Sequence, residues 1–170
     1  MDIEQMIYIN KDKLYRLCLY LERSRDKADE LFQDTWLRAL EKMHQYDKDK
    51  PFYPWLTRVA INLYRDKLRR FKLEVKRRTF EPEDFTSFSR KENVSLEEEF
   101  IKKEELRIVL GSIHNLGDKY KLPLFLVLGE QMSYREVADI LEIDEKLVKS
   151  SIYDGRQKLK KILEKEGFCD

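Results

Sequence analysis

Apolar residues recur at three- and four-residue steps along much of this chain, and that spacing predicts helices. Residues 11–22 predict a first amphipathic helix. Residues 26–43 predict a second one with a longer apolar stripe, formed by Ala28, Leu31, Phe32, Thr35, Trp36, Ala39, Leu40 and Met43. No stretch alternates apolar and polar residues as a half-buried strand does, so we expect an all-α fold.

The stretch from residue 46 to residue 53 lacks this periodicity and contains Pro51, so we expect a loop there. Pro54 suits the first position of a third helix, because an N–H at a helix start has no partner within the helix. The buried side of this third helix is predicted to hold Leu56, Val59, Ala60, Leu63 and Leu68.

Two small helical domains joined by a flexible linker are the simplest interpretation of the whole pattern. We expect a first domain over residues 1–73, a linker over 74–95 and a second domain over 96–170. Most of the linker is polar and aperiodic, and it contains a proline. The second domain is expected to include a short helix with Pro123 near its first turn.

Residues 132–159 predict two short helices joined by a tight turn, which is the pattern of a helix-turn-helix. Ser133 and Glu136 have the spacing of a capping box, which fixes the start of the first helix. The second helix of such a motif lies in the major groove of DNA. An ordinary helical hairpin within an all-α core is the alternative. The predicted buried positions are Val137, Ala138, Ile140, Leu141, Leu147, Val148 and Ile152.

The net charge of +1 excludes a uniformly basic protein, but it hides a basic stretch over residues 58–78. Aromatic faces stack on unpaired bases for about 1–3 kcal/mol per base, and cations bind phosphates. A cluster of both kinds therefore suits single-stranded nucleic acid, unless Phe52 and Trp55 simply pack against the second helix. The residues of this cluster are Tyr46, Phe52, Tyr53, Trp55, Asn62, Arg65, Arg69 and Arg70.

Catalytic, metal-binding and membrane functions have little support in the sequence. His44 and His114 have no Cys or His at ligand spacing, and no phosphate loop or nucleophile elbow occurs. Cys18 and Cys169 form no metal motif or disulfide framework, which fits a reducing cytoplasm. Charges interrupt the N-terminal apolar positions, and the apolar run 122–128 is too short to span a bilayer. We expect no enzyme activity, cofactor, metal, signal peptide or membrane insertion.

Three motifs in order resemble the extracytoplasmic-function (ECF) sigma factors. They are DKADELFQDTWLRAL (26–40), PFYPWLTRVAINLYRDKLRR (51–70) and SYREVADILEIDEKLVKSSIYDGRQKLKKIL (133–163). The resemblance implies a sigma-2-like bundle that binds the β′ clamp helices of core RNA polymerase and recognises and melts the −10 promoter element. It also implies a sigma-4-like helix-turn-helix domain that binds the β flap and the −35 element. An anti-sigma factor is a further expected partner.

The resemblance also implies roles for individual residues. Polymerase binding is expected at Glu30, Gln33 and Asp34. Binding of the −10 element, with one flipped-out base, is expected at Tyr46, Phe52, Tyr53, Trp55, Arg58, Asn62, Arg65, Asp66, Arg69 and Arg70. Binding of the −35 element is expected at Lys146, Lys149, Ser150, Tyr153 and Arg156.

The sequence departs from the usual family pattern at the turn and in the recognition helix. Glu142 stands where glycine is common, and a left-handed backbone there would cost roughly 1 kcal/mol without glycine. Ser151 and Asp154 replace two arginines, which predicts weaker phosphate binding at −35. Gly155 replaces an alanine.

Two other functions are compatible with the helical pattern. A helix-turn-helix regulator could bind DNA without polymerase, and a helical interaction adaptor could carry basic patches that are only solvated surface. The polar face of the 26–40 helix favours the sigma factor, because a simple repressor has no need of it.

Overall fold

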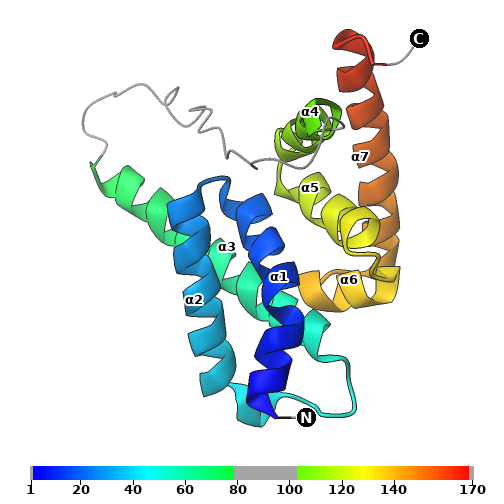
Figure 1. Ribbon diagram of the computed structural model, residues 1–170. Coiled ribbons are helices and arrows are strands. Elements are labelled where there is room, and N and C mark those ends of the chain that lie inside the picture. Colours follow the sequence, from blue (N-terminus) through cyan, green and yellow to red (C-terminus); the bar gives the residue numbers. More distant parts are fainter. Residues whose placement is uncertain (1, 79–102, 169–170) are drawn as a thin grey trace. The chain divides into compact units, whose positions relative to one another are not determined.

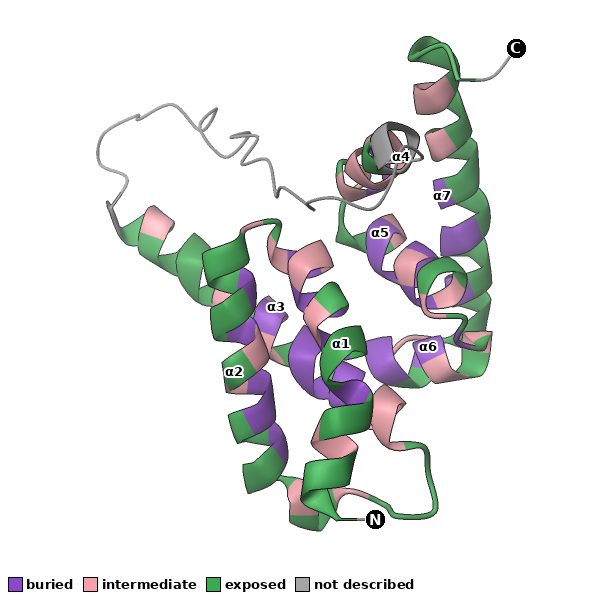
Figure 2. Ribbon diagram, viewed as in Figure 1, coloured by how far each residue is buried: buried purple, intermediate pink, exposed green. Residues whose placement is uncertain are grey.

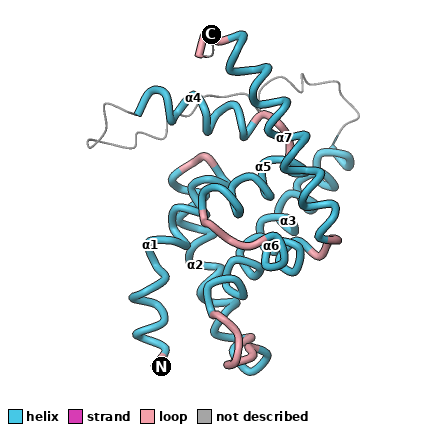
Figure 3. The backbone as a smooth tube through the Cα atoms, turned by 90° about the vertical axis from the view of Figure 1, so that its right-hand side faces the viewer, coloured by secondary structure: helices cyan, strands magenta, loops and turns pink. Residues whose placement is uncertain are grey.

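The computed structural model describes residues 2–78 and 103–168 (Figure 1). The chain divides into two compact units, residues 1–96 and 97–170, and each has its own apolar core. The described residues form helices and turns with no strand among them, which confirms the expected all-α fold (Figure 3). No helix within the described ranges is both long enough and apolar enough to span a membrane.

The described residues of the first unit, 2–78, form three α-helices: α1 (Ile3–Glu22), α2 (Arg25–Glu41) and α3 (Phe52–Arg78). Each packs against the other two, and a short 3₁₀ turn, η1 (Met43–Gln45), follows α2. Their buried residues lie at helical spacing on the sides that face one another (Figure 2). Burying a leucine stabilises a fold by roughly 1.5–3 kcal/mol. The core includes Leu14, Leu17, Leu21, Leu31, Trp36, Leu56, Ala60 and Ile61.

Helices α1 and α3 are longer than the predicted ones, whereas α2 is close to its predicted length. Helix α1 begins at Ile3 rather than at residue 11. The sequence pattern missed its first turns because their apolar side chains are exposed and give no amphipathic pattern. Helix α3 begins at Phe52, so Pro54 occupies its third position, where an N–H still has no helical partner. The same helix runs to Arg78, so residues 74–78 are helical rather than linker. Residues 79–95 lie outside the described ranges.

The second unit contains α4 (Lys103–His114), α5 (Asp118–Leu124), a π-helical turn η3 (Phe125–Gly129), α6 (Tyr134–Leu141) and α7 (Glu145–Lys165). Helices α4, α5 and α6 all pack against α7, which is therefore the central helix of this unit. Pro123 lies near the end of α5 rather than in its first turn. Proline has no N–H for the helical hydrogen bond, and the regular helix ends at the next residue.

Helices α6 and α7 form the predicted helix-turn-helix. The Ser133 N–H donates to Glu136 Oε2 at 2.8 Å, and the Glu136 N–H donates to Ser133 Oγ at 3.2 Å, so the capping box is confirmed. Between the helices Glu142 has φ 56° and ψ 44°, which is the left-handed conformation expected there. Val148 and Ile152 are buried as predicted, but Leu147 is exposed.

Replacing Glu142 by glycine is expected to stabilise the second unit by about 1 kcal/mol, because glycine adopts the left-handed conformation without the clash of a Cβ. Thermal unfolding followed by circular dichroism should show a midpoint several degrees higher. Glu142→Ala is the matched control, since it removes the carboxylate but keeps the Cβ. An equal gain in both variants would contradict a backbone origin.

Candidate functional site

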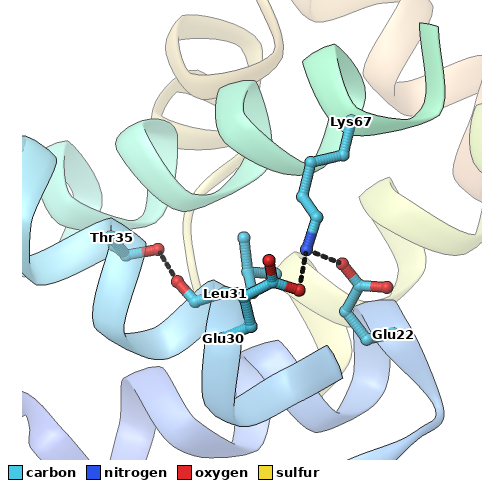
Figure 4. A network of polar contacts seen from close by, with 5 residues as sticks. All are labelled: Glu22, Glu30, Leu31, Thr35 and Lys67. Atoms are coloured by element: carbon cyan, nitrogen blue, oxygen red, sulfur yellow. Dashed lines mark hydrogen bonds and ion pairs between the residues drawn. The ribbon is translucent and has the colours of Figure 1, made fainter. Parts of the chain in front are cut away.

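Helix α2 presents a polar face away from the bundle. Glu30 and Gln33 are exposed, and Asp34 is half-buried; their spacing places all three on one side of the helix. The opposite side is packed, and there the Thr35 hydroxyl donates to the Leu31 carbonyl at 2.6 Å (Figure 4). The predicted polymerase-binding residues therefore lie on the side of α2 opposite its packed one, and their binding to polymerase stays a prediction.

Two leucines extend this face, and the sequence pattern did not identify them. Leu37 is exposed and lies one helical turn after Gln33 and Asp34. Leu40 is 43% exposed, although its spacing fits the predicted buried stripe. The spacing of Leu37 does not match that of the buried residues of α2, and this mismatch could have predicted its exposure from the sequence. Apolar side chains beside polar ones are the composition of a protein-binding surface.

Glu30 is engaged within the protein as well as exposed on its surface. The Lys67 ammonium on α3 lies 3.2 Å from Glu30 Oε2 and 3.4 Å from Glu22 Oε1 (Figure 4). Burial lowers the pKa of Lys67, but the carboxylates of Glu22 and Glu30 together raise it above its ordinary value. We refer to Glu22, Glu30 and Lys67 as the ion triad. It joins helices α1, α2 and α3.

The predicted aromatic cluster is present at the start of α3. The ring centroids of Tyr46, Phe52 and Trp55 lie 5.2–5.5 Å apart, and all three rings are half-buried. Phe52 also stacks on Trp36 of α2, with 6.4 Å between centroids. Phe52 therefore packs against α2, while all three rings keep some exposed surface. Their binding to nucleic acid stays a prediction.

Tyr53 contacts another helix. Its ring faces α1 instead, where the Lys13 ammonium lies 5.5 Å from the ring centroid. Both Phe52 and Tyr53 belong to helix α3 rather than to the predicted loop. A helix separates consecutive side chains by about 100°, so the two rings point to different neighbours.

Local hydrogen bonds shape the turn before α3 and position Tyr46. The Tyr46 hydroxyl donates to the Lys50 carbonyl. Within the turn, the Asp49 N–H donates to Asp47 Oδ1 at 3.1 Å, and the Lys50 N–H donates to the Asp47 carbonyl at 3.0 Å. An aspartate that accepts from the backbone two residues later is typical of a tight turn.

The polar residues predicted to bind the −10 element line the exposed side of α3. Arg58, Asn62, Asp66 and Arg70 follow one another at four-residue steps and are all exposed, so they form one row along the helix. Beside that row, Arg65 is half-buried and Arg69 is exposed. Asp66 Oδ1 lies 3.7 Å from Arg69 Nη1, so this carboxylate pairs with a neighbouring cation.

The residues predicted to bind the −35 element share one side of α7, and all five are exposed. The opposite side holds Val148 and Ile152, which pack into the unit. The Ser150 hydroxyl donates to the Leu147 carbonyl at 3.1 Å, which leaves its oxygen available as an acceptor. The five residues are Lys146, Lys149, Ser150, Tyr153 and Arg156.

Three residues of the recognition helix depart from the usual family pattern, and two of them, Ser151 and Gly155, are buried. Ser151 is 1% exposed and packs inside the unit, whereas Asp154 is exposed. The weaker phosphate binding expected from these two replacements stays a prediction. A Cβ on Gly155 would lie 2.9 Å from Leu124 Cδ1 and 3.4 Å from Tyr120 Cβ. Glycine therefore allows α5 and α7 to approach closely.

The described residues offer little for metal binding or nucleophilic chemistry. No group of three or more His, Cys, Asp or Glu side chains within ranges 2–78 and 103–168 could hold a metal ion. Burial, with a smaller effect of Glu22, raises the pKa of the Cys18 thiol to about 12. A thiol that stays protonated at neutral pH is a poor nucleophile.

Comparison with known proteins matches each of the two units to a protein family. Residues 6–74 match the Sigma-70 region 2 family, and residues 106–159 match the Sigma-70 region 4 family. The first range contains every residue predicted to bind polymerase or the −10 element. The second contains every residue predicted to bind the −35 element.

Characterised relatives match over nearly the whole chain. The ECF RNA polymerase sigma factor SigM of Bacillus subtilis is 30% identical over 94% of this chain and 94% of its own length. SigW of the same organism, also an ECF RNA polymerase sigma factor, is 29% identical over 93% of this chain and 87% of its own length.

Solved structures share the fold. The sigma factor RpoE of Bartonella quintana, solved with the anti-sigma factor NepR, is 19% identical with a TM-score of 0.75, covering 96% of this chain and 97% of its own. CnrH, solved with the cytosolic domain of CnrY, is 23% identical with a TM-score of 0.67, covering 95% and 86%.

Proposed function

Because this chain belongs to the ECF RNA polymerase sigma factors, we propose that its two helical units divide promoter recognition between them. As a sigma factor it directs transcription initiation, and its partners are core RNA polymerase and promoter DNA. We assign polymerase binding and the −10 element to the first unit, and the −35 element to the second.

The polar face of α2 is the proposed contact with the β′ clamp helices. Gln33 and Asp34 supply hydrogen-bond acceptors and a negative charge, and the exposed Leu37 supplies apolar area at the next turn. Acidic groups facing a basic partner speed association and fix orientation, and the buried core of a protein interface is more apolar than its rim.

The start of α3 is the proposed −10 site. Extracting a base from a duplex costs a few kcal/mol, and a pocket that holds the base offsets part of that cost. The half-buried rings of Phe52 and Trp55 offer a stacking surface, and Asn62, two turns after Trp55, offers an amide for a base edge. Arg58 and Arg70 in the same row are suited to phosphates.

The exposed side of α7 is the proposed −35 site. Lys146, Lys149 and Arg156 are suited to phosphates, and Ser150 and Tyr153 to base edges in the major groove. Asp154 reduces the attraction of this surface for DNA. We expect weak binding by this unit alone. Joining both units in one chain raises the effective concentration of each at the promoter once the other is bound.

The chain itself performs no chemistry in this proposal, because polymerase makes the phosphodiester bonds. It acts where RNA polymerase acts, in the cytoplasm. RpoE, which shares this fold, was solved bound to an anti-sigma factor. We propose that an anti-sigma factor also holds this chain inactive by covering its polymerase-binding surface, including the α2 face.

The ordered pair of family matches, residues 6–74 and 106–159, is the observation that supports this function most directly. The test is run-off transcription with core polymerase on fragmented genomic DNA, with pull-down of core by the free chain. Initiation from a defined set of promoters is expected. Tight DNA binding without core binding would instead favour a stand-alone regulator, and failure of both would favour an interaction adaptor.

A further inference from the structure

The ion triad is asymmetric in its exposure to solvent. The side chain of Glu22 is 11% exposed, that of Lys67 33%, and that of Glu30 62%. Water screens an exposed ion pair much more than a buried one, so the Glu22–Lys67 contact is the firmer of the two. Lys67 is therefore held mainly by the less exposed Glu22, and its ammonium also contacts the more exposed Glu30.

The position of Glu22 at a helix end explains why the Lys67 ammonium is held beside it. Glu22 is the last residue of α1, and the end of a helix carries partial negative charge that disfavours a carboxylate. An ammonium group close to that end offsets both the charge of the carboxylate and the partial charge of the helix end. Lys67 has three N–H donors, so one of them can serve Glu22 while another serves Glu30 (Figure 4).

We propose that Lys67 is a positioning residue for the polymerase-binding face of α2. Through its contact with Glu30 Oε2 it restricts the rotamers of that carboxylate, and the second carboxylate oxygen remains available to a basic side chain of polymerase. A pre-ordered side chain loses less conformational entropy on binding. This inference rests on the proposed function, because it requires α2 to contact polymerase.

Lys67 lies on the wrong side of α3 to act on DNA directly. The DNA-facing row comprises Arg58, Asn62, Asp66 and Arg70, whereas Lys67 contacts residues of α1 and α2. Its effect should therefore appear in core binding and not in the choice of −10 sequence. That separation distinguishes it from a residue that only supports the fold, whose loss would affect both.

The experiment is a double-mutant cycle in the full chain, with the Kd for core polymerase measured by fluorescence titration at fixed salt. Lys67→Met is expected to weaken core binding three- to tenfold, about 0.7–1.4 kcal/mol. Lys67→Arg should bind within twofold of the parent, because arginine keeps the charge and several donors. In a Glu30→Gln background, Lys67→Met should cause no further loss of affinity.

Controls separate positioning from folding. Lys72→Met removes a cation from the exposed surface of α3 and should leave core affinity unchanged. Glu22→Gln combined with Lys67→Met removes the carboxylate that would be left unpaired. This variant should recover the melting temperature of the parent while keeping the weaker core binding. Selectivity between fork DNA with native and altered −10 bases, measured on assembled holoenzyme, should match the parent.

Equal losses from Lys67→Met in the parent and Glu30→Gln backgrounds would overturn the inference, and so would unchanged or tighter core binding. A failure of the proposed function looks different. If Asp34→Lys also leaves core affinity unchanged, α2 is not the polymerase-binding face. If Asp34→Lys weakens binding while Lys67→Met does not, only the positioning role is lost.

Discussion

Replacing Asp34 by lysine is expected to weaken core polymerase binding by roughly 10- to 100-fold, about 1.4–2.7 kcal/mol. The reason is that a half-buried carboxylate on the outer face of α2 becomes an ammonium, so attraction to a basic partner turns into repulsion. Half-burial reduces solvent screening, which makes this the most sensitive of the three predicted polymerase-binding positions.

Asp34 is a cleaner test than Glu30 because of the ion triad. Glu30→Arg would place a second cation beside Lys67, so it would strain the packing of α2 on α3 as well as alter the outer face. Titration of labelled protein with core polymerase measures the effect. Asp12→Lys is the matched control, since it makes the same charge change on an exposed position of α1. Equal losses in the two variants would indicate a general charge effect and contradict the assignment of α2.

The helices themselves were predictable because their determinants are local. The apolar stripe of α2 contains Leu31 and Trp36 at helical spacing, and the Ser133–Glu136 box states where α6 begins. Glu142 was expected in a left-handed turn, and it is. Each of these inferences needs only residues within a few positions of one another, which is the range over which a sequence pattern is informative.

The site was less predictable because contact and burial depend on distant parts of the chain. The Glu30–Lys67 contact joins residues 37 positions apart, and no spacing rule connects them. Leu40 fits a buried stripe but is exposed. Ser151 stands where the family pattern has an arginine, whereas the packing of α7 buries it.

Replacing Asn62 by alanine is expected to lower the preference for the native base at one −10 position by about 5- to 100-fold, with core affinity unchanged. A side-chain amide that bonds a base edge on both its donor and its acceptor contributes roughly 1–3 kcal/mol of discrimination. Asn62 is exposed in the α3 row, two turns from Trp55, and therefore close to the stacking surface proposed for the flipped base. The measurement is the Kd of holoenzyme for fork DNA with each of the four bases at each −10 position.

Arg70→Ala is the informative comparison, because it lies in the same row but is assigned to a phosphate. It should weaken binding to all fork sequences alike and reduce the slope of log affinity against log salt by about one unit. Asn62→Ala should do the reverse, changing the order of base preferences while leaving the salt slope intact. If both variants weaken every sequence equally, the amide of Asn62 does not read a base. The aromatic rings at the start of α3 would then hold that base without a hydrogen-bonding partner, and discrimination at −10 would have to come from stacking and shape.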